Sequence, residues 1–303
     1  MENKSVIKRA ITSDGGARIV CCDSTEIVTE ACRIHHTSKT MTAVLGRALT
    51  GASLMGSLLK NKTDSLTLRI DGNGPAGLIV CVSDYMGCVR GYAENPEAEL
   101  PPNEHGKLDV GGAVGSGTLY VIRDLGMNEP YIGSSPIVSG EIAEDLTEYF
   151  ATSEQTPTVC ALGVRVGRDN MCTSAGGYLL QLMPGAEECT VSRLESNVRL
   201  MKPISELIAG GAGPEEIISA VLSGFDFEMF DEFDASYLCP CQREKYLSAL
   251  AGLSSEDISE ICESGKPVET QCRFCGKTYS FTPDEIMNEV KMKTAHRNSN
   301  NCK

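Results

Sequence analysis

Four cysteines in the last quarter of the sequence limit how that part of the chain can fold. Cys239 and Cys241 form one close pair, Cys272 and Cys275 form a second, and 30 residues separate the pairs. Thiolates bind zinc at about 2.3 Å, and four of them complete a tetrahedral structural site. Gly276 lets the chain reverse after the second pair while backbone amides point at sulfur. We therefore predict a zinc site with these four cysteines as ligands; scattered reduced thiols are the alternative.

The charge balance argues against two classes of partner. The chain has 303 residues, enough for two domains, with 27 basic and 41 acidic side chains and a net charge of −14. Non-specific binding to nucleic acid rests on neutralisation of phosphates by Lys and Arg. Attachment to anionic membranes needs the same residues. We expect neither nucleic acid nor a membrane as a partner.

The start of the chain predicts a cytoplasmic protein. Residues 1–20 hold no apolar signal-peptide core, and no stretch reaches the roughly 18 apolar residues of a membrane span. The 14 cysteines should then stay reduced or bind metal. Those outside the two pairs follow no ligand spacing, and we expect most of them to be small core residues. They are Cys21, Cys22, Cys32, Cys81, Cys88, Cys160, Cys172, Cys189, Cys262 and Cys302.

Residues 1–185 have the pattern of an α+β domain with mostly antiparallel strands. After a polar lead, we expect a strand at 17–22 and helices at 24–35 and 38–60. The second helix is rich in small residues, which favours close packing against a sheet. The later elements expected are strands at 66–70, 78–82, 88–92, 118–123 and 135–139, a helix at 141–150, and strands at 158–168 and 178–183.

A glycine-rich segment at 110–117 is similar to a phosphate loop in composition only. A phosphate loop opens a helix, whose N-terminal amides hold the anion. Here the glycines precede a strand, and their spacing matches neither standard nucleotide fingerprint. We predict no nucleotide site in this segment.

Residues 186–235 are predicted to be a helical, acidic-aromatic linker. Pro203 and Pro214 stand where the first-turn proline of a helix belongs. Four of the seven phenylalanines then fall within 225–233, and residues 225–234 include five acidic and no basic side chains. We expect a helix or loop whose aromatic side chains dock on the first domain, and we hypothesise that this apolar surface can undock.

Residues 236–303 are predicted to be the zinc module. Pro240 predicts a helix start between the first two ligands, where the helix N-terminus would stabilise their thiolates. The other elements expected here are a helix after Ser254, a hairpin of 268–271 with 278–281, and a last helix after Thr282.

No second set of catalytic groups accompanies the cysteines, so we expect no enzyme. Catalytic zinc keeps an open position and usually draws on His or carboxylate. The histidines lie outside the cysteine framework, at His35, His36, His105 and His296. The chemistry would then depend on the thiolates, which oxidants attack. Oxidation to disulfides would remove the ligands, and loss of the metal should unfold a module with so few core residues.

Several motifs of the first domain accompany the cysteine pairs. They are Arg123-Asp-Leu-Gly-Met127 with Pro130-Tyr131, Tyr149-Phe150 before Ser153-Glu154-Gln155, and Gly176-Gly177-Tyr178 leading to Leu182-Met-Pro-Gly185. With Cys-x-Cys and Cys-x-x-Cys near the end of a chain of this length, they make nearly the whole sequence resemble the redox-regulated heat-shock protein 33 family of holdase chaperones.

The resemblance implies an inactive, reduced form with one zinc ion per chain. Peroxide with unfolding stress, or hypochlorite, would form the disulfides Cys239–Cys241 and Cys272–Cys275 and release the zinc. The module and the linker would unfold, and the protein would dimerise and bind unfolding client proteins without ATP as part of a stress response. The candidate client-binding residues are the linker phenylalanines, Phe225, Phe227, Phe230 and Phe233.

Two other classes of function stay open at this point. An enzyme could have a catalytic α+β domain and a purely structural zinc ribbon, and would show turnover in a substrate screen. A zinc-ribbon protein acting on nucleic acid or in translation would need a basic face around the second cysteine pair. The acidic balance of the chain disfavours that class.

Overall fold

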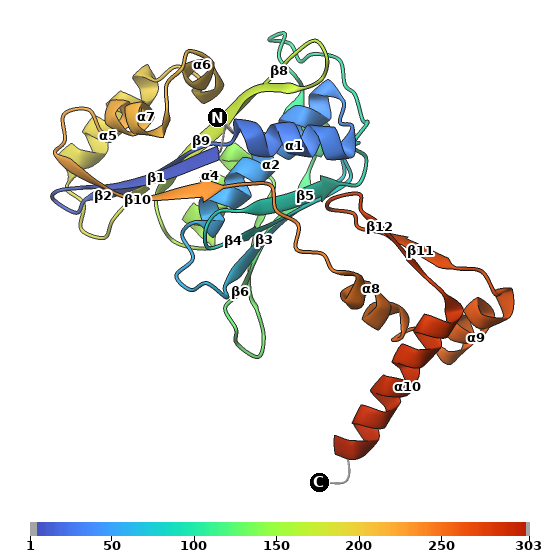
Figure 1. Cartoon of the computed structure of the whole chain (residues 1–303). Helices are drawn as coiled ribbons and strands as arrows, with labels where there is room; N and C mark the ends of the chain where they lie inside the picture. The colour runs from blue at the N-terminus through green and yellow to red at the C-terminus, as the bar shows by residue number, and fades with distance from the viewer. Residues whose placement is uncertain (1–4, 301–303) are drawn as a thin grey trace. The chain divides into compact units, whose positions relative to one another are not determined.

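The computed structural model describes residues 5–300, with the side chains of all of these except Asp231 and residues 294–300. The chain divides into two compact units, Met1–Leu238 and Cys239–Lys303. The first has two five-stranded sheets and the second has a two-stranded hairpin, each unit with its own helices (Figure 1). All neighbouring strands within the sheets are antiparallel. The α+β class expected from the sequence is confirmed.

The two sheets of the first unit take their strands from different parts of the sequence: the first sheet from its two ends and the second from its middle. The first sheet has the order β10-β1-β2-β9-β8, and the second has β5-β4-β3-β6-β7. The first consists of β1 (Ser5–Thr12), β2 (Ala17–Asp23), β8 (Thr158–Val166), β9 (Cys172–Leu182) and β10 (Phe227–Ala235). The second consists of β3 (Ser65–Gly72), β4 (Leu78–Asp84), β5 (Val89–Ala93), β6 (Gly117–Asp124) and β7 (Tyr131–Pro136).

Helix α2 (Lys39–Gly56) lies between the two sheets and is buried along nearly its whole length. It contacts β3, β4 and β5 of one sheet and β8 and β9 of the other, and α1 (Thr25–His35) packs beside it. Its small residues permit this approach: a Cβ atom on Gly46 would lie 2.8 Å from Val28, and one on Gly51 would lie 2.7 Å from Leu146. The sequence predicts that this helix packs against one sheet, whereas in the structure it lies between two.

Three helices cover the other face of the first sheet. They are α5 (Glu188–Leu200), α6 (Ile204–Ala209) and α7 (Pro214–Val221), coloured yellow to gold in Figure 1. Leu194, Ile204 and Ile218 of these helices form a core with Ile19 and Leu180 of the sheet. Pro214 occupies the first turn of α7, as predicted, whereas Pro203 is the residue before α6.

The sequence does not predict two strands, β1 and β10. The polar lead forms β1, and the stretch expected to be a helix or a loop forms the edge strand β10. The two pair from Ser5 opposite Ala235 to Thr12 opposite Phe227, with a register shift between Lys8 and Arg9. A bulge of this kind breaks the two-residue alternation from which strands are predicted.

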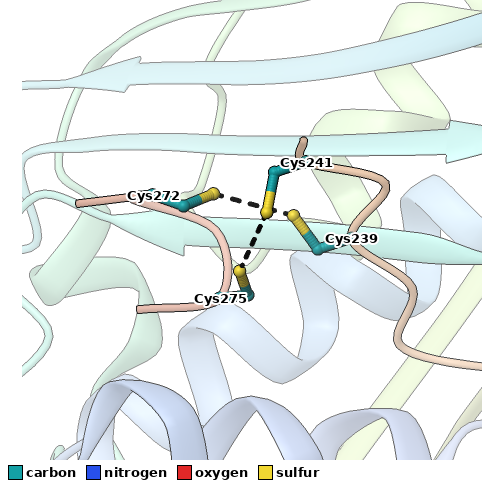
Figure 2. Close-up of side chains that lie close together, drawn as sticks. All are labelled: Cys239, Cys241, Cys272 and Cys275. Carbon is teal, nitrogen blue, oxygen red and sulfur yellow. Dashed lines mark hydrogen bonds between the residues drawn. The ribbon is translucent and has the colours of Figure 1, made fainter. Parts of the chain in front are cut away.

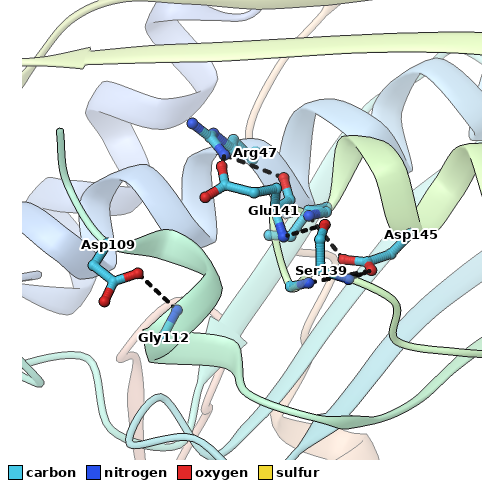
Figure 3. A network of polar contacts seen from close by, with 8 residues as sticks. Arg47, Asp109, Gly112, Ser139, Glu141 and Asp145 are labelled. Carbon is cyan, nitrogen blue, oxygen red and sulfur yellow. Dashed lines mark hydrogen bonds and ion pairs between the residues drawn. The ribbon is translucent and has the colours of Figure 1, made fainter. Parts of the chain in front are cut away.

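The glycine-rich segment precedes β6, as predicted, but it also forms the short helix α3 (Val110–Val114). The Asp109 carboxylate begins this helix by accepting a hydrogen bond from the Gly112 amide at 2.8 Å (Figure 3). Within residues 5–300, no helix has the length and apolar character needed to cross a membrane.

One buried carboxylate organises the turn between β7 and α4 (Ala143–Thr152). Asp145 is 1% exposed, and its carboxylate accepts hydrogen bonds at 2.8–3.2 Å from the amides of Val138, Ser139, Gly140 and Ile142. In the same turn, Glu141 pairs with Arg47 of α2 (Figure 3). The turn is therefore attached to the central helix of the unit.

Replacing Asp145 with Ala should leave these amides without their acceptor, and those of Gly140 and Ile142 are buried. We expect the free energy of unfolding to fall by about 2–4 kcal/mol, because hydrogen bonds to a charged group contribute about 1.5–3 kcal/mol each and do not add fully. Urea unfolding followed by circular dichroism measures the change. Glu144→Ala, an exposed change in the same helical turn, should stay within about 0.5 kcal/mol. Equal losses in the two variants would contradict this account.

Candidate metal centre

The second unit consists of short elements around the cysteines. They are α8 (Arg243–Leu250), α9 (Ser255–Ser264), β11 (Val268–Gln271), β12 (Thr278–Phe281) and α10 (Pro283–Asn300). The helix after Ser254, the hairpin and the helix after Thr282 all agree with the sequence prediction. Ser254 accepts a hydrogen bond from the Asp257 amide at 3.1 Å, and Glu285 accepts one from the Thr282 amide at 2.9 Å.

The prediction that Pro240 starts a helix is wrong. Helix α8 begins at Arg243, after both cysteines of the first pair. Residues two apart on a helix point in nearly opposite directions. Cys239 and Cys241 can direct both sulfur atoms to one point only because this stretch lies outside the helix.

The apolar core of this unit is small. Tyr279, Phe281 and Ile286 are its buried members, with partly buried side chains around them. The Arg243 guanidinium lies 4.5 Å from the centre of the Phe281 ring and pairs with Glu285 at 2.8 Å. Such a core stabilises a fold only weakly, so the cysteine cluster should matter for the stability of the unit.

The four cysteine sulfur atoms converge on a common point (Figure 2). All of them lie within 4.8 Å of one another. Two hydrogen-bond contacts join the pairs, at 3.6 Å between the sulfur atoms of Cys239 and Cys272 and at 3.4 Å between those of Cys241 and Cys275. A tetrahedron with metal–sulfur bonds of about 2.3 Å has sulfur–sulfur edges of about 3.8 Å, whereas a disulfide is about 2.05 Å long. The donor set and its spacing therefore fit a metal ion.

Hydrogen bonds to sulfur favour the thiolate at Cys272. Burial opposes its ionisation, but donors from the Tyr246 hydroxyl, the Cys275 and Phe274 amides and the Cys239 thiol outweigh burial and lower the pKa of Cys272 to about 7. Burial raises the pKa of Cys239 and of Cys275, although each sulfur also accepts a hydrogen bond from a backbone amide, which acts to lower the pKa.

The turn that holds the second pair has the geometry predicted for it. Gly276 has a φ of 70°, and its amide donates to the Cys272 carbonyl at 2.8 Å. The Cys272 amide in turn donates to the Lys277 carbonyl at 2.9 Å. Glycine takes this left-handed backbone conformation without strain, so the reversal lets the neighbouring amides face sulfur.

Two tyrosines complete the surroundings of the cluster, and the sequence analysis does not identify them. The Tyr279 hydroxyl lies 3.3 Å from the Cys241 sulfur and donates to the Cys241 carbonyl at 3.2 Å. The Tyr246 hydroxyl donates to the Cys272 sulfur, and the two rings lie 5.1 Å apart. A metal-bound thiolate would carry no proton and could only accept, so Tyr246 would donate to Cys272, and Tyr279 would direct its one proton to the Cys241 sulfur instead of the carbonyl. One sequence signal could have identified Tyr279: the alternation of exposed and buried residues along β12, which turns its side chain inward.

Removing both hydroxyls, in the Tyr246→Phe, Tyr279→Phe variant, should leave more charge on the two sulfur atoms. We expect peroxide to release the metal about 2–10 times faster, because each hydrogen bond contributes about 0.5–1.5 kcal/mol. A chromogenic chelator added with peroxide reports the rate. Tyr120→Phe, in the first unit, is the control, and unchanged release in the double variant would rule out this role for the hydroxyls.

The remaining cysteines mostly lie in the core, as expected. Cys21, Cys22, Cys32, Cys81 and Cys172 are buried, Cys88, Cys160 and Cys262 are half-buried, Cys189 is exposed, and Cys302 lies outside the described residues. Burial raises the pKa of Cys22 and of Cys81 well above the usual range of a thiol. Such thiols react slowly with oxidants.

The linker phenylalanines lie along and beside β10. Phe225 and Phe227 are half-buried against the core under α5–α7, and Phe233 is half-buried against the core around α2. Phe230 is 43% exposed. Three of the four therefore dock on the first unit, as expected.

Fold and cluster together define a two-unit α+β protein whose second unit holds four clustered cysteines that could bind a metal ion. A family model described as Hsp33 protein matches residues 5–282. The 33 kDa chaperonin of Clostridioides difficile (strain 630) is 42% identical over 289 residues, which cover 95% of this chain and 99% of that protein. The 33 kDa chaperonin of Symbiobacterium thermophilum is 45% identical over 279 residues, 92% and 95% of the two chains.

A solved structure agrees with these sequence matches. The crystal structure of the 33 kDa chaperonin (heat shock protein 33 homolog) from Thermotoga maritima has a TM-score of 0.89 and 37% identity to this chain. The match covers 97% of this chain and 100% of the other. This chain belongs to the Hsp33 family of chaperones. Its relatives are named as chaperonins rather than as enzymes.

Removing the metal should unfold the second unit and leave the first folded. With a strong chelator, or in a Cys272→Ser variant, we expect amide protection across residues 239–293 to fall at least about 100-fold, or about 2.8 kcal/mol. Hydrogen exchange read by mass spectrometry separates the two units. Cys262→Ser, in the same unit but outside the cluster, should keep its protection. Full protection in Cys272→Ser would show that the unit folds without the cluster.

Proposed function

We propose that this chain is a redox-regulated, ATP-independent holdase of the cytoplasm. It is inactive while one zinc ion is held by Cys239, Cys241, Cys272 and Cys275. The observation that carries the proposal is the convergence of four sulfur atoms within 4.8 Å in a unit whose buried apolar core is small. When bound, zinc would supply the tetrahedral anchor that folds the unit and would keep its ligands deprotonated.

Oxidation by peroxide consumes two thiolates for each disulfide formed. One thiolate attacks a peroxide oxygen, so that an S–O bond forms, the O–O bond breaks and the leaving hydroxide becomes water. The second thiolate attacks the sulfenic sulfur, so that the S–S bond forms, the S–O bond breaks and a second hydroxide leaves. Each hydroxide takes up a proton from solvent and becomes water. Two sulfur atoms lose two electrons, and peroxide gains them.

The pairing of the disulfides decides whether oxidation opens the unit. Hydrogen-bond contacts between sulfur atoms of the reduced form join the two turns, and disulfides there would hold the turns together. Disulfides within each turn, Cys239–Cys241 and Cys272–Cys275, would remove all four ligands and leave the turns free to separate. We propose the second pairing, because only it converts oxidation into unfolding.

The chain directly before Cys239 is attached to both sheets of the first unit. Strand β10 pairs with β1, the Val89 amide donates to the Ser236 carbonyl at 2.9 Å, and the Leu238 amide donates to the Val89 carbonyl at 3.0 Å. The Tyr237 hydroxyl donates to the Gly91 carbonyl at 2.8 Å. In the proposed switch, unfolding of the second unit spreads into this segment and releases β10.

Release of β10 would expose its phenylalanines, and Phe225 just before it, to unfolding proteins. Phe225, Phe227, Phe230 and Phe233 are the proposed client-binding residues, and we propose that the oxidised protein forms a homodimer. Aromatic side chains bury large apolar areas in contacts with other proteins, which suits capture of clients with exposed cores.

The deciding experiment combines zinc release with light scattering of a heat-unfolding client protein. Reduced protein is compared with protein treated with peroxide at mildly raised temperature. About one zinc per chain should leave on oxidation, and aggregation of the client should be suppressed only after that. If zinc stays bound, or if both forms suppress aggregation equally, the cluster is structural and the switch is wrong.

Replacing Phe227 and Phe230 with Ser should weaken client capture by the oxidised protein. We expect several-fold more protein to be needed for half-suppression of aggregation, because each change removes a large apolar contact area. Leu200→Ser is the control, since Leu200 is 85% exposed and lies outside β10. Unchanged suppression by the double variant would place client binding elsewhere.

A further inference from the structure

A cavity of about 370 Å³ opens on the first unit at the C-terminal end of α2. Three cationic side chains line it, Arg18 from β2, Lys60 after α2 and Arg123 from β6, together with the acidic Asp64 and Glu154. Its volume falls within the range of small-molecule sites, about 300–1,000 Å³. Nothing in the proposed switch uses this cavity.

Arg18 is half-buried and lacks a carboxylate partner among the described residues. Its Nε donates to the Gln181 side-chain oxygen at 2.9 Å, and Gln181, itself 2% exposed, donates to Thr158 at 3.1 Å. A guanidinium offers five N–H donors, and the described residues accept only this one. Burial lowers the pKa of Arg18, as expected for a cation removed from water without a counter-charge.

The acidic side chains that line the cavity already have partners other than Arg18 and Lys60. Glu154 pairs with Arg123 at 3.0 Å and accepts a hydrogen bond from the Tyr149 hydroxyl at 2.5 Å. Asp64 accepts hydrogen bonds from the backbone and side-chain amides of Asn61 at 3.2 and 3.0 Å. Lys60 is exposed, and no described residue pairs with it. Arg18 and Lys60 are thus available for an anion, in a chain whose net charge is −14.

One part of the cavity wall is apolar, and the cavity continues past Arg18. Met55, Leu58 and Phe150 are among its lining residues. A second hollow of about 450 Å³ shares Arg18 and Thr156 with the first and extends to Pro184. An apolar body attached to an anionic group would therefore find both a charged contact and an apolar wall.

We propose that this cavity binds a small amphiphilic anion, with its carboxylate or phosphate head group on the Arg18 guanidinium and its apolar part along Met55, Leu58 and Phe150. The planar fork of a guanidinium matches both head groups through two parallel hydrogen bonds. Lys60 at the rim adds a second positive charge. The ligand supplies the counter-charge that the fold does not provide to Arg18.

Ligand-observed NMR titration of the reduced full-length protein tests the proposal. The probes are octanoate and octyl phosphate, with 1-octanol as the neutral match and inorganic phosphate as the head group alone. Octanoate or octyl phosphate should bind saturably, at least tenfold more tightly than octanol or phosphate. Arg18→Gln should weaken that binding at least tenfold, Lys60→Gln less, and Arg33→Gln, on the surface of α1 and paired with Glu30, not at all.

Thermal unfolding of each variant shows whether it is folded. If Arg18→Gln does not fold, Lys60→Gln tests the requirement for positive charge independently. Equal binding of octanol and octanoate would overturn the proposal, as would unchanged affinity in folded Arg18→Gln. The proposal would also be overturned if an extended acidic peptide bound while neither octanoate nor octyl phosphate did, because the cavity would then recognise polypeptide. These measurements need neither zinc release nor client capture, so they stand apart from the proposed switch.

Discussion

The second unit is built around four sulfur atoms, brought by two turns to one point. The buried members of its apolar core cluster are Tyr279, Phe281 and Ile286, too few to hold several short elements together by burial alone. The turns that carry the cysteines are shaped for this meeting, through an extended stretch before α8 and through the left-handed Gly276. A fold that rests on thiolates is open to chemistry that a hydrophobic core does not undergo, because oxidants react with sulfur and not with aliphatic carbon.

The first unit is stabilised differently. Helix α2 lies between two sheets, its small residues let both approach, and a turn built around Asp145 is attached to it through Glu141 and Arg47. Most of its buried cysteines have no charge nearby that would favour the thiolate, and burial raises their pKa. One chain therefore combines a unit whose buried thiols are poorly reactive with a unit that holds four clustered thiols.

Local patterns in the sequence predict much of this structure. The clustering of the four cysteines follows from their spacing, and the elements with clear periodicity, such as α2 and the β11–β12 hairpin, lie where expected. Strands β1 and β10 are missed because their bulged pairing breaks the alternation, and Pro240 misleads because a first-turn proline and a proline between two ligands have the same sequence context. The roles of Tyr246, Tyr279 and Arg18 come from tertiary contacts between segments far apart in the chain, which no local pattern records.

Strand β10 is also an edge strand of the first sheet, where it lies next to β1. If β10 leaves, β1 becomes the edge, with a row of N–H and C=O groups that have lost their partners. An extended polypeptide of any sequence can pair with such an edge through its own backbone. The departure of a single strand would thus offer a foreign chain an apolar segment and a hydrogen-bonding template together, and the second of these does not depend on which side chains that chain carries.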